Sequence, residues 1–286
     1  MKRRARVVLG LAPALATLAL VFGSALFGSL LQSLGHAPHV GIEEFPTLRH
    51  YRDVFTDPAT PVALARTLLT ALPATLIGSI LGVAVGLAWP ARRGLAGALA
   101  QLPLLVPYVV AVALATLWLA PSGVVSRTLA ASGLLESPQA FPRILDGAAP
   151  WGVIATLVWK QIPFTALLVA SLRSGADRLL DDVAVVFGAS RFQRFRYVTW
   201  PSIWPAVVAG AVITLAYNLG ALEVPLLLDG GTRDTLAVRA WRAYADADVA
   251  RRPEAMAFAW SMTALALLAA AALLALGRRV FPGDGR

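Results

Sequence analysis

The chain contains no cysteine. This absence excludes disulfide bonds and metal sites built from thiolates. Charge is also scarce, because charged residues make up 14% of the 286 residues and apolar residues 58%. Ordinary soluble domains carry about 25% charged residues. The balance indicates a chain that exposes much of its surface to lipid.

Residues that carry chemistry are few as well. The only lysines are Lys2 and Lys160, and neither lies in a glycine-rich loop that could bind nucleotide phosphates. His36 and His39 are spaced closely enough to share a metal ion, but no acid or further histidine follows at ligand spacing. No Gly-x-Ser-x-Gly or His-Glu-x-x-His motif occurs. We therefore expect no catalytic residue, no metal site and no cofactor bound by this chain.

Long runs with almost no charge divide the sequence. Each is long enough for the about 20 helical residues that span a hydrocarbon core. We interpret the first as an uncleaved span, because the apolar core of a signal peptide has only about 7–15 residues. The expected spans are Val7–Gly35, Thr67–Ala91, Leu95–Leu119, Trp151–Leu172, Ile203–Leu222 and Ala255–Gly277. The predicted fold class is all-α, a polytopic membrane protein with six transmembrane helices.

The runs define three segments. Residues 1–66 hold a basic tip, the first span and a polar outer segment. Residues 67–274 hold the other five spans, with a charged loop at 177–205, and residues 275–286 form a short tail.

The net charge of +9 is compatible with nucleic-acid binding, but its distribution favours a membrane protein. If the N-terminus is cytoplasmic, the cytoplasmic segments hold 14 lysines and arginines and 4 acids, against 10 and 12 on the opposite side. The cytoplasmic loops are also shorter, so their positive charge is denser. We expect a multi-pass protein of the cell inner membrane with both termini in the cytoplasm, and no nucleic-acid partner.

The loop at 177–205 predicts a helix–turn–helix on a membrane face, shaped to be bound by another protein. An apolar helical stripe at spacing i, i+4, i+7 and i+8 is formed by Leu179, Val183, Val186 and Phe187. Acids at the start of this helix complement its dipole. Gly188 can close the helix, and Ser190 can cap a second short helix from Arg191 to Tyr197.

This loop resembles the EAA loop of ABC-importer permeases, in which an E-A-A triplet is followed at fixed spacing by G-A-S, an aromatic residue, a valine and a proline-containing end. The matching residues are Asp182-Val183-Ala184, Gly188-Ala189-Ser190, Phe195, Val198, Pro201 and Pro205. Asp182 stands where the family has glutamate, and Val183 where it has alanine. Six spans with such a loop between the fourth and fifth resemble the type I ABC-importer permease. The segment Asn218–Leu228 resembles the fifth span of the branch of this family that handles polyamines, ferric iron and related small solutes.

The resemblance implies a permease subunit that forms the path for a small solute with a second permease subunit, identical or different. Two cytoplasmic ABC ATPase subunits would bind ATP and Mg²⁺, and a periplasmic or lipid-anchored solute-binding protein would deliver the solute. The residues implied in ATPase coupling are Asp182, Val183, Ala184, Phe187, Gly188, Ala189 and Ser190. The alternative is that this amphipathic loop packs under its own helix bundle.

Four polar residues are candidates for the translocation path: Lys160, Gln161, Asn218 and Glu223. A charge within a span costs roughly 2.5–3.5 kcal/mol on insertion scales, so Lys160 should face a cavity or a partner. The alternative is that Lys160 binds a freed backbone carbonyl or an acid on a neighbouring span. Asn218 and Glu223 suit a cation such as a polyamine, whereas Lys160 in the same cavity would disfavour one. Glu223 is equally interpreted as an interfacial residue at the outer end of its span.

Two other functions compete with the importer. An ion-coupled secondary transporter usually carries acids or broken helices at the membrane midplane, and the predicted spans hold no acid. An intramembrane enzyme is disfavoured by the missing nucleophile and metal motifs.

Overall fold

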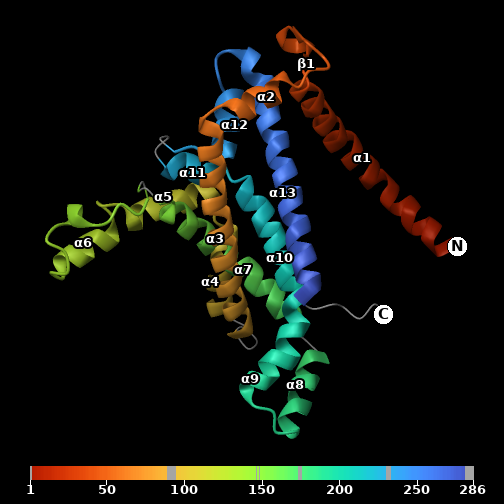
Figure 1. Ribbon diagram of the computed structural model, residues 1–286. Coiled ribbons are helices and arrows are strands. Elements are labelled where there is room, and N and C mark those ends of the chain that lie inside the picture. The colour runs from red at the N-terminus through yellow and green to blue at the C-terminus, as the bar shows by residue number, and fades with distance from the viewer. Residues whose placement is uncertain are drawn as a thin grey trace. The chain divides into compact units, whose positions relative to one another are not determined.

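The computed structural model describes residues 2–88, 95–145, 147, 149–172, 176–229 and 233–280. Almost all regular structure in these residues is helical (Figure 1). Within the described residues, six helices are long and apolar enough to cross a membrane: Gly10–Ser33, Ala59–Ala88, Tyr108–Ala131, Trp151–Leu172, Arg191–Leu219 and Val249–Arg279. The predicted all-α fold with six spans is confirmed.

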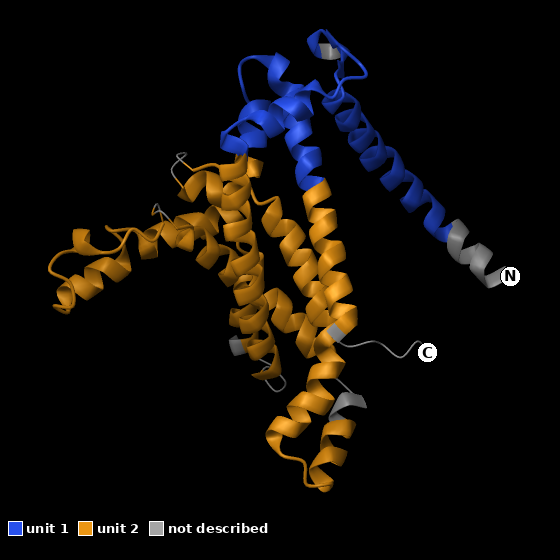
Figure 2. Cartoon of the chain, in the orientation of Figure 1, with its two compact units in different colours: residues 1–60, 239–263 blue, residues 61–238, 264–286 orange. Residues whose placement is uncertain are grey.

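The chain divides into two compact units, coloured separately in Figure 2. Unit 1 comprises residues 1–60 and 239–263, and unit 2 comprises residues 61–238 and 264–286. Three helices, α3 (Ala59–Ala88), α12 (Leu236–Tyr244) and α13 (Arg252–Val280), contribute residues to both units.

Unit 1 begins with α1 (Lys2–Ser33) and a small antiparallel hairpin. Its strands pair His36 with Glu43 and Ala37 with Ile42. The elements after α1 are β1 (His36–Ala37), η1 (Pro38–Val40), β2 (Ile42–Glu43), α2 (Arg49–Thr56) and, later in the chain, η4 (Val249–Arg251). Hydrogen bonds tie α1 to its neighbours, since Trp260 donates to Ser29 at 3.2 Å and Ser33 bonds Tyr51 at 2.8 Å.

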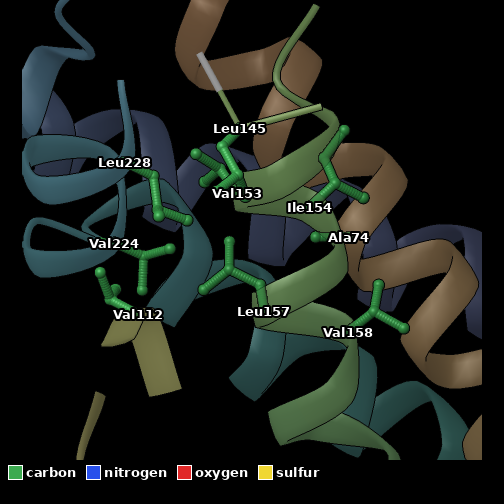
Figure 3. Close-up of a cluster of buried hydrophobic side chains, with 10 residues drawn as sticks. Ala74, Val112, Leu145, Val153, Ile154, Leu157, Val158, Val224 and Leu228 are labelled. Carbon is green, nitrogen blue, oxygen red and sulfur yellow. The ribbon is translucent and has the colours of Figure 1, made fainter. Parts of the chain in front are cut away.

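The core of unit 2 surrounds α7 (Trp151–Leu172), whose bounds agree with the predicted fourth span. This helix packs against α4 (Leu95–Leu105), α5 (Tyr108–Leu119), α10 (Trp200–Leu219) and α11 (Glu223–Leu228). Figure 3 shows Leu157 of α7 pointing toward Val112 and Val224, while Val158 lies on the side of Ala74. These side chains are buried.

A face of small residues brings α3 (Ala59–Ala88) close to α7. A Cβ at Gly82 would lie 2.4 Å from the Cβ of Thr165, and one at Gly86 would lie 2.8 Å from the Cβ of Val169. Close approach through glycine is a common way for membrane helices to gain packing contacts. The glycines are therefore part of packing within this subunit.

The second and third predicted helices differ from those in the structure. The third predicted helix, Leu95–Leu119, is broken at Val106 and Pro107 into α4 and α5. A proline has no N–H for the helix ladder and disfavours helical geometry in the residue before it, which accounts for the break. The second predicted helix begins at Ala59 rather than Thr67, because Arg66 is taken into α3 and paired there with Asp229.

The elements that follow α5 are short. They are α6 (Val124–Ala131) and η2 (Pro138–Ala140), which lie in the expected outer loop. The fifth predicted span ends at Leu219, because Gly220 closes α10 and α11 begins separately at Glu223.

Candidate functional site

The loop between the fourth and fifth spans is a helical hairpin with both of its predicted caps. Helix α8 (Ala176–Val186) is closed by Gly188, two residues beyond its end, which has φ +78°. The Ala189 N–H donates to the Ala184 carbonyl at 3.0 Å and the Gly188 N–H to the Val185 carbonyl at 2.9 Å. These are the two bonds of a Schellman closure.

Ser190 begins the second helix, α9 (Arg191–Arg194). Its hydroxyl accepts from the Gln193 N–H, and the Gln193 side chain accepts from the Ser190 N–H at 2.8 Å. This reciprocal capping box satisfies two backbone donors that the helix start leaves open. The predicted roles of Gly188 in closing a helix and of Ser190 in capping one are confirmed.

The second helix does not end at Tyr197 as predicted. It continues through a π-helical segment, η3 (Phe195–Thr199), directly into α10. The Trp200 N–H donates to the Phe195 carbonyl, while Pro201 has no N–H to donate. The wider turn accommodates the missing donor. The second arm of the hairpin, α9, and the fifth span are therefore one continuous helix from Arg191 to Leu219.

An ion pair joins the two arms of the hairpin. Arg194 Nη1 lies 3.3 Å from Asp181 Oδ2, and both side chains are about three-quarters buried. The neighbouring acid, Asp182, is exposed. Asp181 therefore holds the two arms of the hairpin together, whereas Asp182 faces solvent.

The predicted apolar stripe of α8 is exposed. Val186 and Phe187 are each 85% exposed, Leu179 is 67% exposed and Val183 is 52% exposed. Figure 1 shows α8 and α9 at the end of α10, beyond the ends of α3 and α4. The surface of the stripe is therefore not covered by the bundle of unit 2, contrary to the alternative in which the loop packs beneath it.

Two candidate path residues meet in a buried polar cluster. Asn218 Oδ1 accepts from Gln161 Nε2, and Asn218 Nδ2 donates to Thr75 Oγ1 at 2.9 Å. All three side chains are buried. The cluster links α3, α7 and α10 through side-chain hydrogen bonds in addition to apolar contacts.

Lys160 lies one residue from this cluster and bonds to the backbone at the break between α4 and α5. Its Nζ donates to the Pro103 carbonyl at 2.7 Å and to the Val106 carbonyl. It also lies 4.6 Å from the centre of the Tyr108 ring. These are the contacts of the alternative in which the lysine binds freed backbone carbonyls. Its role in the path stays a prediction.

The remaining candidate, Glu223, is exposed in the first turn of α11. An aromatic pair that the sequence analysis did not single out lies at the ends of the neighbouring helices. Tyr108 of α5 stacks on Tyr217 of α10 with ring centres 5.1 Å apart. Residues distant in sequence make this pair, so no local pattern points to it.

A buried ion pair also escaped the sequence analysis. Arg66 Nη2 of α3 donates to Asp229 Oδ1 at 2.8 Å. Burial raises the pKa of the Asp229 carboxyl, against the opposing effect of the Arg66 guanidinium. The apolar residues on both sides of Arg66 were the available signal that it lies inside a span.

Comparison with known families gives one match that covers most of the chain. Residues 74–282 match the family described as "Binding-protein-dependent transport system inner membrane component".

Two proteins illustrate the relatives that this chain resembles. It is 30% identical over 237 residues to the inner membrane ABC transporter permease protein YnjC of Escherichia coli (strain K12), covering 80% of this chain and 43% of that protein. It is 33% identical over 113 residues to the spermidine/putrescine transport system permease protein PotB of Haemophilus influenzae, covering 40% of this chain and 38% of that protein. The chain thus spans less than half the length of YnjC.

The fold is similar to that of a solved bacterial ABC transporter involved in the import of the acidic polysaccharide alginate. The TM-score is 0.76 with 21% identity, covering 98% of this chain and 97% of the other. A further structure of an alginate ABC transporter, in complex with an alginate pentasaccharide-bound periplasmic protein, matches with the same TM-score and identity and covers 98% and 96% of the two chains.

Proposed function

Because this chain belongs to the family of binding-protein-dependent transport system inner membrane components, we propose that it is the membrane-spanning permease subunit of an ATP-driven ABC importer. It forms part of the path for a small solute and transmits the work of a separate ATPase through the loop 177–205. ATP and Mg²⁺ bind to the ATPase subunits, and this chain catalyses no reaction itself.

The exposed hairpin is the observation that carries this proposal. An uncovered apolar stripe, including Phe187 at 85% exposure, supports contact with a partner protein. The adjacent Asp182 adds a charge that the hairpin does not use internally. The coupling residues are then Asp182, Val183, Ala184, Phe187, Gly188, Ala189 and Ser190. The helix continuity into α10 supports transmission from the hairpin to the membrane interior.

The assembly follows from the same role. Two ABC ATPase subunits bind the hairpins of two permease subunits, and a periplasmic or lipid-anchored binding protein delivers solute on the opposite side. The hairpin and both termini then lie in the cytoplasm. The density of positive charge in the short loops on that side supports this orientation.

For the solute, we propose a small cation of the polyamine type. Tyr217, which is 40% exposed near the outer end of α10, and the exposed Glu223 in the first turn of α11 supply an aromatic ring and a carboxylate that suit an ammonium group. The positive charge of Lys160 should repel a cationic solute less than its position in the sequence suggests, because its Nζ donates hydrogen bonds to two backbone carbonyls. Asn218 adjoins Tyr217 in α10, so Asn218 and its hydrogen-bond partner Gln161 form part of the wall of the proposed path.

A co-purification experiment tests the coupling role. The full chain is solubilised in detergent and incubated with its candidate ABC ATPase, as wild type and as Phe187→Asp. The matched control is Leu134→Asp, another exposed apolar residue, at 74% exposure and outside the hairpin. Loss of the ATPase only with Phe187→Asp supports the proposal. If the wild-type chain binds no ATPase, the proposed ABC-importer function is rejected and the ion-coupled secondary transporter becomes the preferred function.

Uptake measurements test the solute. Cells that depend on this chain are supplied with radiolabelled spermidine or sulfate, with wild type, Glu223→Gln or the control Glu136→Gln, another exposed glutamate. We expect wild-type uptake of spermidine, reduced only by Glu223→Gln. Uptake of sulfate but not of spermidine would rule out a cationic solute and would leave the proposed coupling role of the hairpin unaffected.

A further inference from the structure

An apolar groove runs along unit 2 between α3, α10 and the end of α13. Its volume is about 660 Å³. Apart from indoles, its polar side chains are those of Thr75 and Ser79, and Thr75 already accepts a hydrogen bond from Asn218. A polar solute here would lose its water and gain almost no hydrogen bonds. The groove therefore suits a hydrocarbon chain.

The groove is long enough to hold a lipid tail. Its lining on α3 extends from Leu72 to Leu87, which is about 22 Å at 1.5 Å per residue. The hydrocarbon of one leaflet is about 15 Å thick, half of the roughly 30 Å core. An acyl chain of one leaflet can therefore lie entirely within the groove, along about two thirds of its lining on α3.

Aromatic residues mark the end of the groove next to the hairpin. Phe195 lies 5.8 Å from Trp200, which lies 5.3 Å from Trp204, measured between ring centres. The Trp204 indole N–H donates to the Gly277 carbonyl at 2.9 Å and joins α10 to α13. Tryptophan with its N–H bonded is typical of the boundary between hydrocarbon and headgroups.

Three arginines lie at the same aromatic end of the groove. Arg196 follows the lining residue Phe195, and Arg278 and Arg279 follow the lining residue Gly277. All three arginines are exposed. Guanidinium groups beside a membrane surface attract anionic lipid headgroups. The charge of the groove's aromatic end thus complements a phosphate.

We propose that this groove binds a membrane phospholipid with an anionic headgroup. Its acyl chain lies along α3 and α10, and its phosphate is held by Arg196, Arg278 and Arg279. Because Phe195 and Trp200 belong both to the groove and to the segment joining α9 to α10, the lipid stabilises the junction between the hairpin and the fifth span. The site is independent of the solute and of the ATPase.

Lipid retention by the purified chain tests the site. The full chain is delipidated in detergent, mixed with phosphatidylglycerol or phosphatidylcholine, and weighed with its retained lipid by native mass spectrometry. We expect wild type to retain phosphatidylglycerol at least about tenfold better, as several basic contacts to a headgroup imply. Arg278→Gln with Arg279→Gln should remove most of this preference, whereas Arg127→Gln, an exposed arginine of α6, should leave it unchanged.

A second variant blocks the hydrocarbon part. Ala211→Trp places an indole in the groove and should abolish retention of either lipid, while Ala98→Trp on the exposed side of α4 should not. Equal retention of the two lipids by wild type, or unchanged retention by Ala211→Trp, would overturn the proposal. Because the chain has no cysteine, Ala84→Cys gives a single thiol at the groove. Disulfide-linked dimers through this thiol without retained lipid would identify a second copy of the chain as the occupant instead.

Discussion

Asn218 of α10 donates from Nδ2 to Thr75 Oγ1 of α3 at 2.9 Å, across 143 positions of the sequence. Both side chains are buried, and the same asparagine accepts from Gln161 of α7. One amide thus holds three helices in register at the depth where the solute path is proposed.

This contact should be measurable as a coupling energy. In a double-mutant cycle of Thr75→Val and Asn218→Leu, followed by unfolding in mixed micelles, we expect a coupling of about 0.6 kcal/mol and at most about 1.7 kcal/mol, the range found for such bonds in membranes. Thr116→Val with Asn218→Leu is the control, because Thr116 bonds within its own helix. Additive effects in the first pair would contradict the structural role of the cluster.

The left-handed backbone at Gly188 predicts a selective effect of substitution. A Cβ at this position meets no atom within 4 Å, so only the backbone conformation, φ +78°, opposes a side chain. Gly188→Val should destabilise the hairpin by roughly 1–2 kcal/mol, seen as faster hydrogen exchange in α8, whereas Gly188→Asn should be nearly neutral because asparagine tolerates this conformation. Similar exchange in both variants would show that the closure contributes nothing to the hairpin.

The two adjacent acids of α8 should behave differently. Asp181→Asn breaks the ion pair with Arg194, which we expect to contribute about 0.2–1 kcal/mol because the pair is partly solvated. Its effect should appear as faster proteolysis of the hairpin. Asp182→Asn should leave proteolysis unchanged and weaken ATPase binding. The reverse pattern would exchange the roles assigned to the two residues.

Lys160→Met tests whether the lysine serves the path, the helix break or both. Removal of the ammonium leaves the Pro103 and Val106 carbonyls without this donor, so hydrogen exchange at the start of α5 should rise. We expect transport to fall while the assembly still forms. Unchanged transport rate and solute affinity, with faster exchange, would leave only the structural role.

The glycine face predicts a sharp contrast between two small changes. Gly82→Ala would place a Cβ 2.4 Å from the Thr165 Cβ and 3.0 Å from the Ile162 carbonyl, forcing α3 away from α7. We expect a loss of about 1–3 kcal/mol, the usual cost of overpacking, measured as a lower Tm. Gly28→Ala in α1 meets nothing within 4 Å and should leave Tm unchanged or raise it.

The features that the sequence predicted well are those with local causes. The span Trp151–Leu172, the closure at Gly188 and the cap at Ser190 each depend on residues within a few positions of one another. Long apolar runs likewise need only their own composition to be recognised as spans.

The features that it missed depend on distant partners or on competing local effects. Arg66 was assigned to a loop because a buried arginine needs an acid, and Asp229 lies 163 positions away. The break at Pro107 was visible as a proline, but the apolar run around it favoured a single span. The meeting of Gln161 with Asn218 required the packing of α7 against α10, which no spacing in the sequence specifies.

The unbroken helix from Arg191 to Leu219 has a mechanical consequence. At 1.5 Å per residue it is a rod of about 42 Å, anchored near one end by Asn218 and carrying the hairpin at the other. A small tilt imposed on α9 turns the rod about its anchored end, so the displacement is largest at the hairpin and decreases along α10 toward Asn218. The wider π-helical turns at 195–199 are the place where the rod can bend, so their stiffness sets how much of the tilt reaches the membrane interior.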